Sequence, residues 1–286
     1  MSTSQPTVAL LGTGTMGAGM ARQVAAAGLE LRVWNRSPEK AEPLSDVATV
    51  CTDVAEAVRG ADVVVTMLFD ADACHDTLRQ AADALGEGTV WVQSSTVGVA
   101  GNDRLVGLAA ELGLTYLDAP VLGTRKPAED GALVVLASGP SSVRPTVDPV
   151  LEAVGSRTVW VSEEPGGASR LKLACNAWVL TVVEGVAESL AMTRALGLDP
   201  ALFLEAVQGS AVEAPYVPLK GKAMIAGDFE PDFALSGGLK DLGLMLDAVG
   251  PTDLEPRILP VLHAQFAEAV EQGYGDQDLA ATYRAL

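Results

Sequence analysis

Short apolar runs alternate with amphipathic stretches through the first half of the chain. The amphipathic stretches have the period of helices, the first at residues 16–27, and Ser37-Pro38-Glu39 predicts the start of another helix. The apolar runs predict strands at residues 7–12, 29–34, 61–68, 88–95, 114–121, 131–138 and 156–162. Nearly continuous apolar strands separated by helices predict an α/β domain with a doubly wound, mainly parallel sheet covered on both faces.

After Pro165 the strand pattern stops. Only isolated small residues interrupt a helical pattern from residue 166 to 197, which predicts one helix about 45 Å long. Further helical stretches follow at residues 200–208, 238–249, 256–272 and 277–285. We therefore predict two domains, residues 1–163 and residues 164–286. The second is all-helical and begins with the long interdomain helix.

The composition narrows the range of partners. The chain of 286 residues has 37 acidic and 19 basic side chains, a net charge of -18. A field of this sign repels nucleic acid and acidic lipid surfaces, so we expect neither as a partner. Any site for an anion needs local donors that overcome this field. The odd number of cysteines, without paired spacing, indicates reduced thiols of a cytoplasmic protein: Cys51, Cys74 and Cys175.

The sequence predicts neither a membrane protein nor a metal-binding site. Residues 1–7 have neither a basic region nor an apolar one, so no secretory signal is predicted. The longest apolar run, residues 177–183, is too short to span a bilayer and Glu184 ends it. His75 and His263 are isolated on predicted helices, so we expect no metal site.

A glycine pattern at the end of the first predicted strand indicates dinucleotide binding. Gly12-x-Gly14-x-x-Gly17 ends the strand and opens a helix. The first glycine permits a tight turn, the second a close approach of the pyrophosphate, and the third close packing of helix on strand. The spacing alone is weak evidence in a chain with 29 glycines, but in this context it predicts a Rossmann domain.

The end of the second predicted strand favours NADP(H), with NAD(H) as the less favoured cofactor. An NAD site usually offers Asp or Glu there to the ribose diol, whereas this chain reads Asn35-Arg36-Ser37. Arg36 would form a charge-assisted fork with a 2′-phosphate, and Asn35 and Ser37 would add neutral donors. The alternative is that Arg36 is an ordinary surface arginine.

One lysine lies in an otherwise apolar part of the long helix. Lys172 and Asn176 are four residues apart, hence on one helix face. Burial of an ammonium lowers its pKa towards neutrality, where the group can exchange protons during turnover. The alternative is a lysine near the helix start whose head reaches water.

Six motifs together resemble the β-hydroxyacid dehydrogenase family, which includes 3-hydroxyisobutyrate dehydrogenases and glyoxylate/succinic semialdehyde reductases. The resemblance covers essentially the whole chain. Its motifs are LLGTGTMGAGMA (residues 10–21), VWNRS (33–37), SSTV (94–97), DAPVLG (118–123), GASRLKLACN (167–176) and GLKDLGLML (238–246). RKPAEDGALVVLASG (residues 125–139) is most similar to the glyoxylate/succinic semialdehyde reductase branch.

The resemblance implies an oxidoreductase that acts on a small, carboxylate-bearing substrate. It also implies a homodimer, with a tetramer as the alternative. Lys172 would be the general acid and base, with Asn176 holding substrate and lysine in register. Residues expected to contact substrate are Thr96, Leu122, Gly123, Thr124, Phe233 and Asp241. Residues expected to contact the cofactor are Gly12, Gly14, Thr15, Met16, Gly17, Asn35, Arg36, Ser37, Met67, Leu68, Thr96 and Lys240. On the residues alone, Lys240-Asp241 would be an exposed helical pair and Phe233 a core aromatic.

The chain departs from the family pattern at Leu122, where the family has a serine that donates to the substrate. A hydrogen bond to a charged group contributes roughly 1.5–3 kcal/mol, so small polar acids such as glyoxylate should bind more weakly. The added apolar volume indicates a larger or less polar substrate. Thr124 is the candidate for a replacement hydroxyl.

Two other functions remain open at this stage. Imine reductases share VWNRS, but usually carry Asp or Tyr in place of Lys172. A non-catalytic NADP-binding scaffold would be expected to lose the proton donor, whereas Lys172 and Asn176 are both present.

Overall fold

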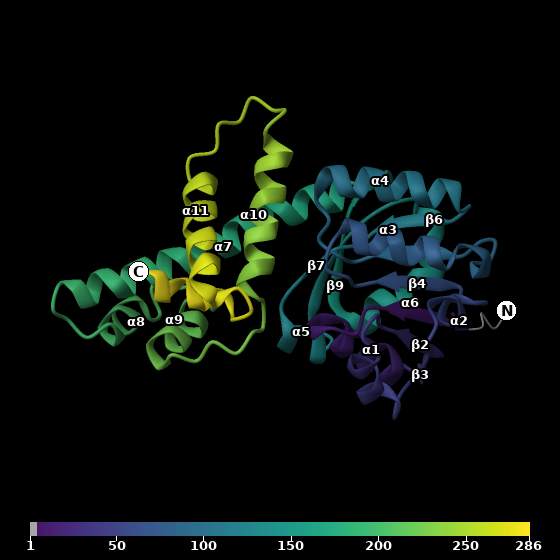
Figure 1. The fold of residues 1–286 in the computed structure, drawn as a ribbon, viewed down its shortest axis with the longest axis horizontal. Coiled ribbons are helices and arrows are strands. Elements are labelled where there is room, and N and C mark those ends of the chain that lie inside the picture. Colours follow the sequence, from purple (N-terminus) through teal and green to yellow (C-terminus); the bar gives the residue numbers. More distant parts are fainter. Residues whose placement is uncertain (1–4) are drawn as a thin grey trace. The chain divides into compact units, whose positions relative to one another are not determined.

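The computed structural model describes residues 5–286 and divides into two compact units, one ending at Lys172 and the other beginning at Leu173 (Figure 1). Helix α7 (Gly167–Ala195) contains the division. A boundary at residue 163 would assign all of α7 to the second domain, and that assignment stays a prediction. The expectation of no secretory signal rests partly on residues 1–4, which lie outside the described residues.

The first unit is built on a nine-stranded sheet in the order β3-β2-β1-β4-β5-β6-β8-β7, with β9 beside β8. The strands β1 to β6 are parallel, whereas β8 runs antiparallel to β6 and β7 and parallel to β9. The mainly parallel, doubly wound sheet is confirmed. The strands are β1 (Val8–Leu11), β2 (Leu31–Trp34), β3 (Thr49–Val50), β4 (Val63–Thr66), β5 (Val90–Gln93), β6 (Thr115–Asp118), β7 (Val121–Leu122), β8 (Leu133–Ser138) and β9 (Gly155–Ser162).

Both faces of this sheet are buried, which explains the nearly continuous apolar strands. Along β1, Val8 and Leu10 face a core completed by α1 and α6, whereas Ala9 and Leu11 face a second core completed by α2, α3 and α4. Successive side chains of a strand point to opposite faces, so each strand serves both cores. The helices are α1 (Thr15–Ala26), α2 (Val54–Val58), α3 (Ala71–Gln80), α4 (Gly98–Glu111), α5 (Arg125–Glu129) and α6 (Arg144–Val154).

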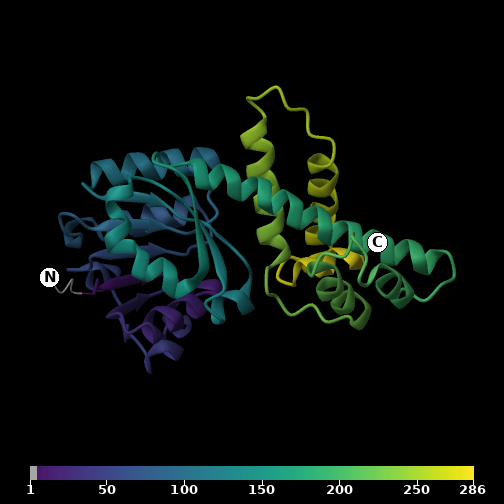
Figure 2. The same ribbon diagram turned by 180° about the vertical axis from the view of Figure 1, so that it is seen from behind.

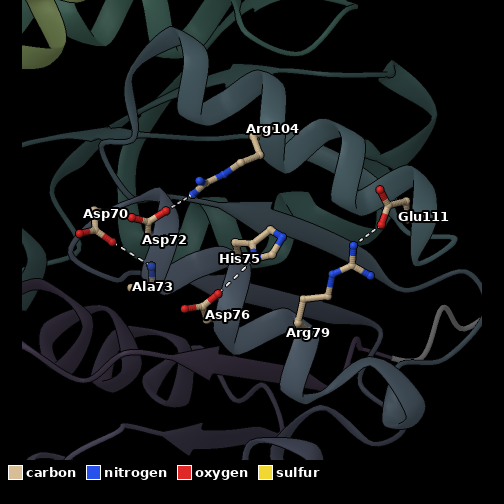
Figure 3. A network of polar contacts seen from close by, with 8 residues as sticks. All are labelled: Asp70, Asp72, Ala73, His75, Asp76, Arg79, Arg104 and Glu111. Carbon is tan, nitrogen blue, oxygen red and sulfur yellow. Dashed lines mark hydrogen bonds and ion pairs between the residues drawn. The ribbon is translucent and has the colours of Figure 1, made fainter.

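Polar contacts cover the outer surface of α3 and α4 (Figure 3). Arg104 of α4 lies 2.5 Å from Asp72 of α3, and Arg79 of α3 pairs with Glu111 of α4. Asp70 caps α3 by accepting a hydrogen bond from the backbone N–H of Ala73 at 2.8 Å. The two ion pairs are exposed, so we expect each to contribute less than about 1 kcal/mol.

The helix predicted from Ser37 onward is wrong. The chain instead makes two short 3₁₀ turns, η1 (Pro38–Lys40) and η2 (Glu42–Leu44). Pro43 has no backbone N–H, so a helix that began at Pro38 would lose a hydrogen bond in its interior. The two-residue strand β3 was not predicted either, because a pair of residues shows no periodicity.

The second unit is helical. Helices α10 and α11 lie side by side, as both views show (Figures 1 and 2). Besides α7, its elements are α8 (Ala201–Val207), α9 (Tyr216–Ala226), α10 (Leu235–Val249), α11 (Leu259–Ala269), the π turn η5 (Val270–Tyr274) and the 3₁₀ segment η6 (Leu279–Ala285). Helix α9 was not predicted because Pro215, Pro218 and Gly221 suggest a break. Both prolines precede or occupy the first turn, where no helical N–H bond is required.

By length and composition alone, helix α7 is long and apolar enough to cross a membrane. Polar residues interrupt it, so that no uninterrupted apolar run within it is long enough to do so. Its most apolar window is 44% buried in the protein. Lys172, Asn176 and Glu184 are buried on this helix, and each makes a hydrogen bond to a protein group. Buried polar groups with protein partners are typical of a core helix of a folded domain.

Candidate active site

The glycine-rich loop after β1 has the geometry of a dinucleotide cradle. Gly12 has φ +104°, and a Cβ there would overlap the Met67 carbonyl oxygen. A Cβ on Gly17 would overlap the Gly12 carbonyl oxygen. Gly14 is the N-cap of α1, and a Cβ on it would meet nothing within 4 Å. Two glycines are therefore required by packing, while the third leaves open space at a helix N-terminus, where a phosphate binds favourably.

A cavity of about 510 Å³ opens beside this loop, within the first unit. Three segments line it: the loop from β1 to α1, the end of β2, and the segment from β4 to α3. Nine predicted cofactor residues line it: Gly14, Thr15, Met16, Gly17, Asn35, Arg36, Ser37, Met67 and Leu68. The other three predicted cofactor residues are not part of the lining. They are Gly12, which packs against the Met67 carbonyl, Thr96 and Lys240.

Two cations line the cavity where a 2′-phosphate is expected. Arg36 and Lys40 both contribute to its wall. Lys40 was not predicted, although a basic residue shortly after Arg36 is visible in the chain. Neither residue forms an ion pair within the part of the chain that the structure describes. Asp76 also lines the cavity, 3.1 Å from the His75 ring.

Asn35 makes two hydrogen bonds within the protein. Its Oδ1 accepts from the backbone N–H of Thr13 at 3.1 Å, and its Nδ2 donates to the Ser37 carbonyl at 3.0 Å. The carboxamide therefore ties the glycine-rich loop to the end of β2. Asn35 also lines the cavity, and its expected contact with the cofactor stays a prediction.

The ends of β4 and β5 are joined by Ser95. Its Oγ accepts from the backbone N–H of Leu68 at 2.8 Å, and its own N–H donates to Gln93 Oε1 at 2.6 Å. Ser95 is buried, and Thr96 is half-buried directly after it. This pairing fixes the two segments from which Leu68 and Thr96 project.

Asp118, at the end of β6, holds the start of α7. Its carboxylate accepts from the N–H groups of Gly166 at 3.0 Å and Ser169 at 2.8 Å, and from Ser169 Oγ at 2.7 Å. The first N–H groups of a helix lack acceptors within the helix. Here a carboxylate at the end of a strand accepts hydrogen bonds from two of them. Burial raises the pKa of Asp118, while the hydrogen bonds from Ser169 and Gly166 oppose that rise. No role was predicted for this aspartate, although it belongs to the DAPVLG motif.

Lys172 lies one turn beyond this cap and is only 8% exposed. Its Nζ donates to the backbone carbonyl of Val121 at 2.7 Å. Leu122 is half-buried directly after that carbonyl. Gly123 follows with φ +129°, and a Cβ there would lie 2.7 Å from the Leu133 side chain. The lysine head is therefore bound to the strand that ends with Leu122, just before Gly123 and Thr124, and does not reach into water as the alternative had it.

Three predicted residues of the second unit lie close together. Asn176 Nδ2 donates to Asp241 Oδ2 at 2.7 Å, and Lys240 Nζ lies 3.1 Å from Asp241 Oδ1. Asp241 is 2% exposed, so Lys240 and Asp241 are not an exposed helical pair. Phe233 is half-buried with its ring against Gly237, where a Cβ would lie 2.9 Å from the ring. Asp241 therefore orients Asn176 and Lys240.

Comparison with known proteins places these features in a family. Residues 7–162 match the family model of the NAD-binding domain of 6-phosphogluconate dehydrogenase, and residues 166–286 match that of NADP-dependent 3-hydroxyisobutyrate dehydrogenase. The chain belongs to the β-hydroxyacid dehydrogenase family. It is thus an NAD(P)-dependent oxidoreductase that acts on CH–OH groups.

Individual relatives agree with this assignment. Glyoxylate/succinic semialdehyde reductase 2 of Arabidopsis thaliana is 30% identical over 98% of this chain and 79% of its own. The uncharacterised oxidoreductase YfjR of Bacillus subtilis is 33% identical over 98% of this chain and 99% of its own. The crystal structure of 3-hydroxyisobutyrate dehydrogenase from Salmonella typhimurium superposes with a TM-score of 0.92 at 26% identity, covering 99% of this chain and all of that one.

The polar groups of this candidate site are donors and cations of the protein itself. Within residues 5–286, no group of three or more His, Cys, Asp or Glu side chains is arranged to hold a metal ion. The groups that the structure supplies are backbone N–H donors, two cations beside a dinucleotide cradle, and a buried lysine.

Proposed function

We propose that this dehydrogenase is NADP-dependent and interconverts a small β-hydroxyacid with its aldehyde or keto acid, with Lys172 as general acid and base. One observation carries the proposal. The Lys172 ammonium is buried and bound to the carbonyl that precedes Leu122 and Gly123, two residues that the family resemblance assigns to substrate.

The residues divide the chemistry between them. When bound, the nicotinamide of the cofactor supplies or accepts the hydride. In the direction of reduction, Lys172 donates a proton to the substrate carbonyl oxygen, which becomes a hydroxyl, and the lysine then regains a proton from solvent. In the direction of oxidation, the neutral amine takes the hydroxyl proton. Asp118 holds the helix that carries this amine, and such positioning accounts for much of the rate of a hydride transfer.

Arg36 and Lys40 support a preference for NADP(H). Both line the cavity beside the glycine-rich loop, and no carboxylate of β2 is available there for a ribose diol. A planar guanidinium and an ammonium on the same wall suit a doubly charged 2′-phosphate. They also supply the local positive charge that an anion needs in a protein of net charge -18.

The substrate that we propose is a carboxylic acid with an apolar body. Gly123, Thr96 and Thr124 would bind its carboxylate. The Thr124 side chain does not cap α5, whose N-cap it is, so its hydroxyl suits a donor to substrate. Leu122 presents an apolar surface in place of a hydroxyl, which favours a body larger or less polar than that of glyoxylate.

We propose that the enzyme is a homodimer. Many large apolar side chains of the second unit are exposed, and buried apolar surface is what a stable subunit interface needs. They include Trp178 at 65%, Met192 at 60%, Leu196 at 71%, Val212 at 75% and Leu254 at 59%.

Oxidation of NADPH, followed by its absorbance, tests the function against a panel of substrates. The panel comprises glyoxylate, succinic semialdehyde, methylmalonate semialdehyde, one bulkier aldehyde acid and one cyclic imine, each repeated with NADH. Turnover of an aldehyde acid with preference for NADPH is the expected result. Turnover of the imine alone would make the protein an imine reductase. Absence of turnover with every aldehyde acid, including a bulkier homologue, would favour a scaffold that binds NADP without catalysis.

A further inference from the structure

The second unit has a hollow of its own, apart from every predicted site residue. Its volume is about 680 Å³, within the range of about 300–1,000 Å³ that is usual for small-molecule pockets. The ends of α7 and α9 line it together with η5 and η6. The lining combines two arginines, three aromatic rings and apolar side chains such as Met224: Arg194, Arg284, Phe229, Tyr274 and Tyr283 supply the charge and the rings.

Both guanidinium groups of this hollow are held in place by aromatic rings. The Arg194 guanidinium lies 5.2 Å from the centre of the Tyr283 ring. That of Arg284 lies 4.2 Å from the Tyr274 ring and 5.7 Å from the Phe229 ring, and it donates to Gln277 Oε1 at 3.1 Å. Stacking occupies the flat face of a guanidinium and leaves N–H groups at its edge available to an anion.

The hollow carries positive charge, although the chain as a whole is acidic. No Asp or Glu side chain of the described residues lines it. Arg22, Arg79 and Arg104 of the first unit all pair with carboxylates. Within residues 5–286, by contrast, neither Arg194 nor Arg284 forms an ion pair. With 37 acidic residues available, two arginines without carboxylate partners on one hollow mark a place for an external anion.

We propose that this hollow binds a small organic anion, a carboxylate or phosphate monoester that carries an aromatic or apolar body. The edges of the two guanidiniums would hold the anionic group by charge-assisted hydrogen bonds. The aromatic rings and Met224 would cover the body. This site is separate from the dinucleotide cavity, which lies wholly within the first unit.

Calorimetric titration of the NADPH-saturated protein tests this site. NADPH fills the dinucleotide cavity, so the probes report on sites outside it, and the substitutions below distinguish the hollow from the proposed substrate site. The probes are 1-naphthoate, 1-naphthyl phosphate and the uncharged 1-naphthalenemethanol. We expect one site for at least one of the two anions, and the stronger of them identifies the anionic group. The uncharged probe should bind at least about tenfold more weakly.

Single substitutions locate the binding. Arg194→Gln and Arg284→Gln should each weaken the anion by about tenfold or more, since each removes a charge-assisted hydrogen bond. Arg257→Gln is the matched control, because Arg257 belongs to the same unit but is 86% exposed and lies outside the hollow; it should bind as the wild type does. NADPH affinity and thermal unfolding verify that each variant is folded. If Arg284→Gln does not fold, Arg284→Lys, which keeps the charge but loses the planar fork, should weaken binding several-fold.

Three results would overturn the proposal. The first is no saturable binding of either anion at millimolar concentration. The second is unchanged binding in both Arg194→Gln and Arg284→Gln. The third comes from sedimentation: if the two variants dissociate an oligomer and neither anion binds the wild type, the hollow is an interface between copies of this chain. None of these results bears on the proposed dehydrogenase activity, which the substrate panel measures separately.

Discussion

Two lysines of this protein are buried in apolar helices, and they are surrounded by different chemistry. Lys172 on α7 is 8% exposed and Lys220 on α9 is 3% exposed. Lys220 donates to Asp278 at 2.7 Å, and the same carboxylate accepts from the backbone N–H groups of Asp232, Phe233 and Ala280. Lys172 donates to a backbone carbonyl at the edge of the sheet, next to Leu122 and Gly123.

The comparison shows that burial of a lysine does not by itself indicate catalysis. In the sequence both lysines follow a leucine in an apolar stretch, and only the structure separates them. The Lys220–Asp278 pair joins α9, the segment before α10 and the final 3₁₀ segment, so we assign it a structural role. Lys172 lies in the first unit, beside loops at the carboxyl ends of the parallel strands, where ligands bind in open α/β sheets.

Loss of the Lys220 ammonium should have the largest effect. Lys220→Met would leave a buried Asp278 without its cation, and breaking a buried ion pair in this way costs about 3–5 kcal/mol. We expect the thermal unfolding midpoint to fall clearly, whereas NADPH affinity at low temperature should be unchanged. Lys222→Met, an exposed lysine of the same helix, is the control and should change stability by less than about 0.5 kcal/mol. Normal stability of Lys220→Met would remove the structural role of this pair.

Lys172→Ala should have the opposite signature. Loss of a general acid lowers turnover by about a hundredfold or more, while the dinucleotide cavity keeps all its lining residues. Turnover and NADPH affinity should be measured together, with Lys126→Ala as the control, because Lys126 is an exposed lysine of the same unit that pairs with Asp130. A near-normal rate for Lys172→Ala would exclude this lysine from the proton transfer.

The sequence predicted most of the sheet because burial on both faces leaves a strong signal. Val8 to Leu11 are all buried, and such runs can be recognised without knowledge of their neighbours. Pro43 and Pro218 show where local reasoning fails in opposite directions. Pro43 prevents the helix that Ser37-Pro38 predicted, whereas Pro218 lies in the first turn of a helix that its neighbours made improbable. The outcome depends on where in a turn the proline falls, which is set by tertiary packing.

The sequence indicated which residues are candidates for the site, but it did not indicate which of them contact one another. The cradle glycines, Arg36 and Lys172 could be found because their spacing and surroundings follow local rules. The partners of Asn35 and Asp241 could not, because Asn35 binds Thr13 across 22 positions and Asp241 binds Asn176 across 65. Contacts over such separations depend on how the chain folds back, which no local pattern records.

Leu122→Ser tests the surroundings of Lys172 rather than the lysine itself. A hydroxyl at this half-buried position would restore a donor for a small polar substrate. A hydrogen bond of roughly 1.5–3 kcal/mol to a charged group corresponds to about one to two powers of ten in kcat/KM. We expect that gain with glyoxylate or succinic semialdehyde, and a loss with a substrate of larger apolar body; Leu122→Val, which keeps an apolar side chain, is the control. No gain with either small acid would show that Leu122 does not set the size or polarity of the substrate.

The smallest effect should come from Glu184, a buried carboxyl group on the helix that also carries Lys172. Burial raises the pKa of Glu184, and Glu188 adds to the rise, against the hydrogen bond from Thr282. Because the folded state prefers the protonated form, stability is greatest below the ordinary glutamate value of 4.5 and falls as pH rises through the higher folded value. Glu184→Gln abolishes this titration. It should therefore stabilise the protein by on the order of 1 kcal/mol at neutral pH and lose that advantage in acid. Denaturant unfolding at several pH values measures this, with Glu205→Gln, an exposed glutamate of the same unit, as control. A difference between Glu184→Gln and wild type that does not vary with pH would show that folding does not raise the pKa of Glu184.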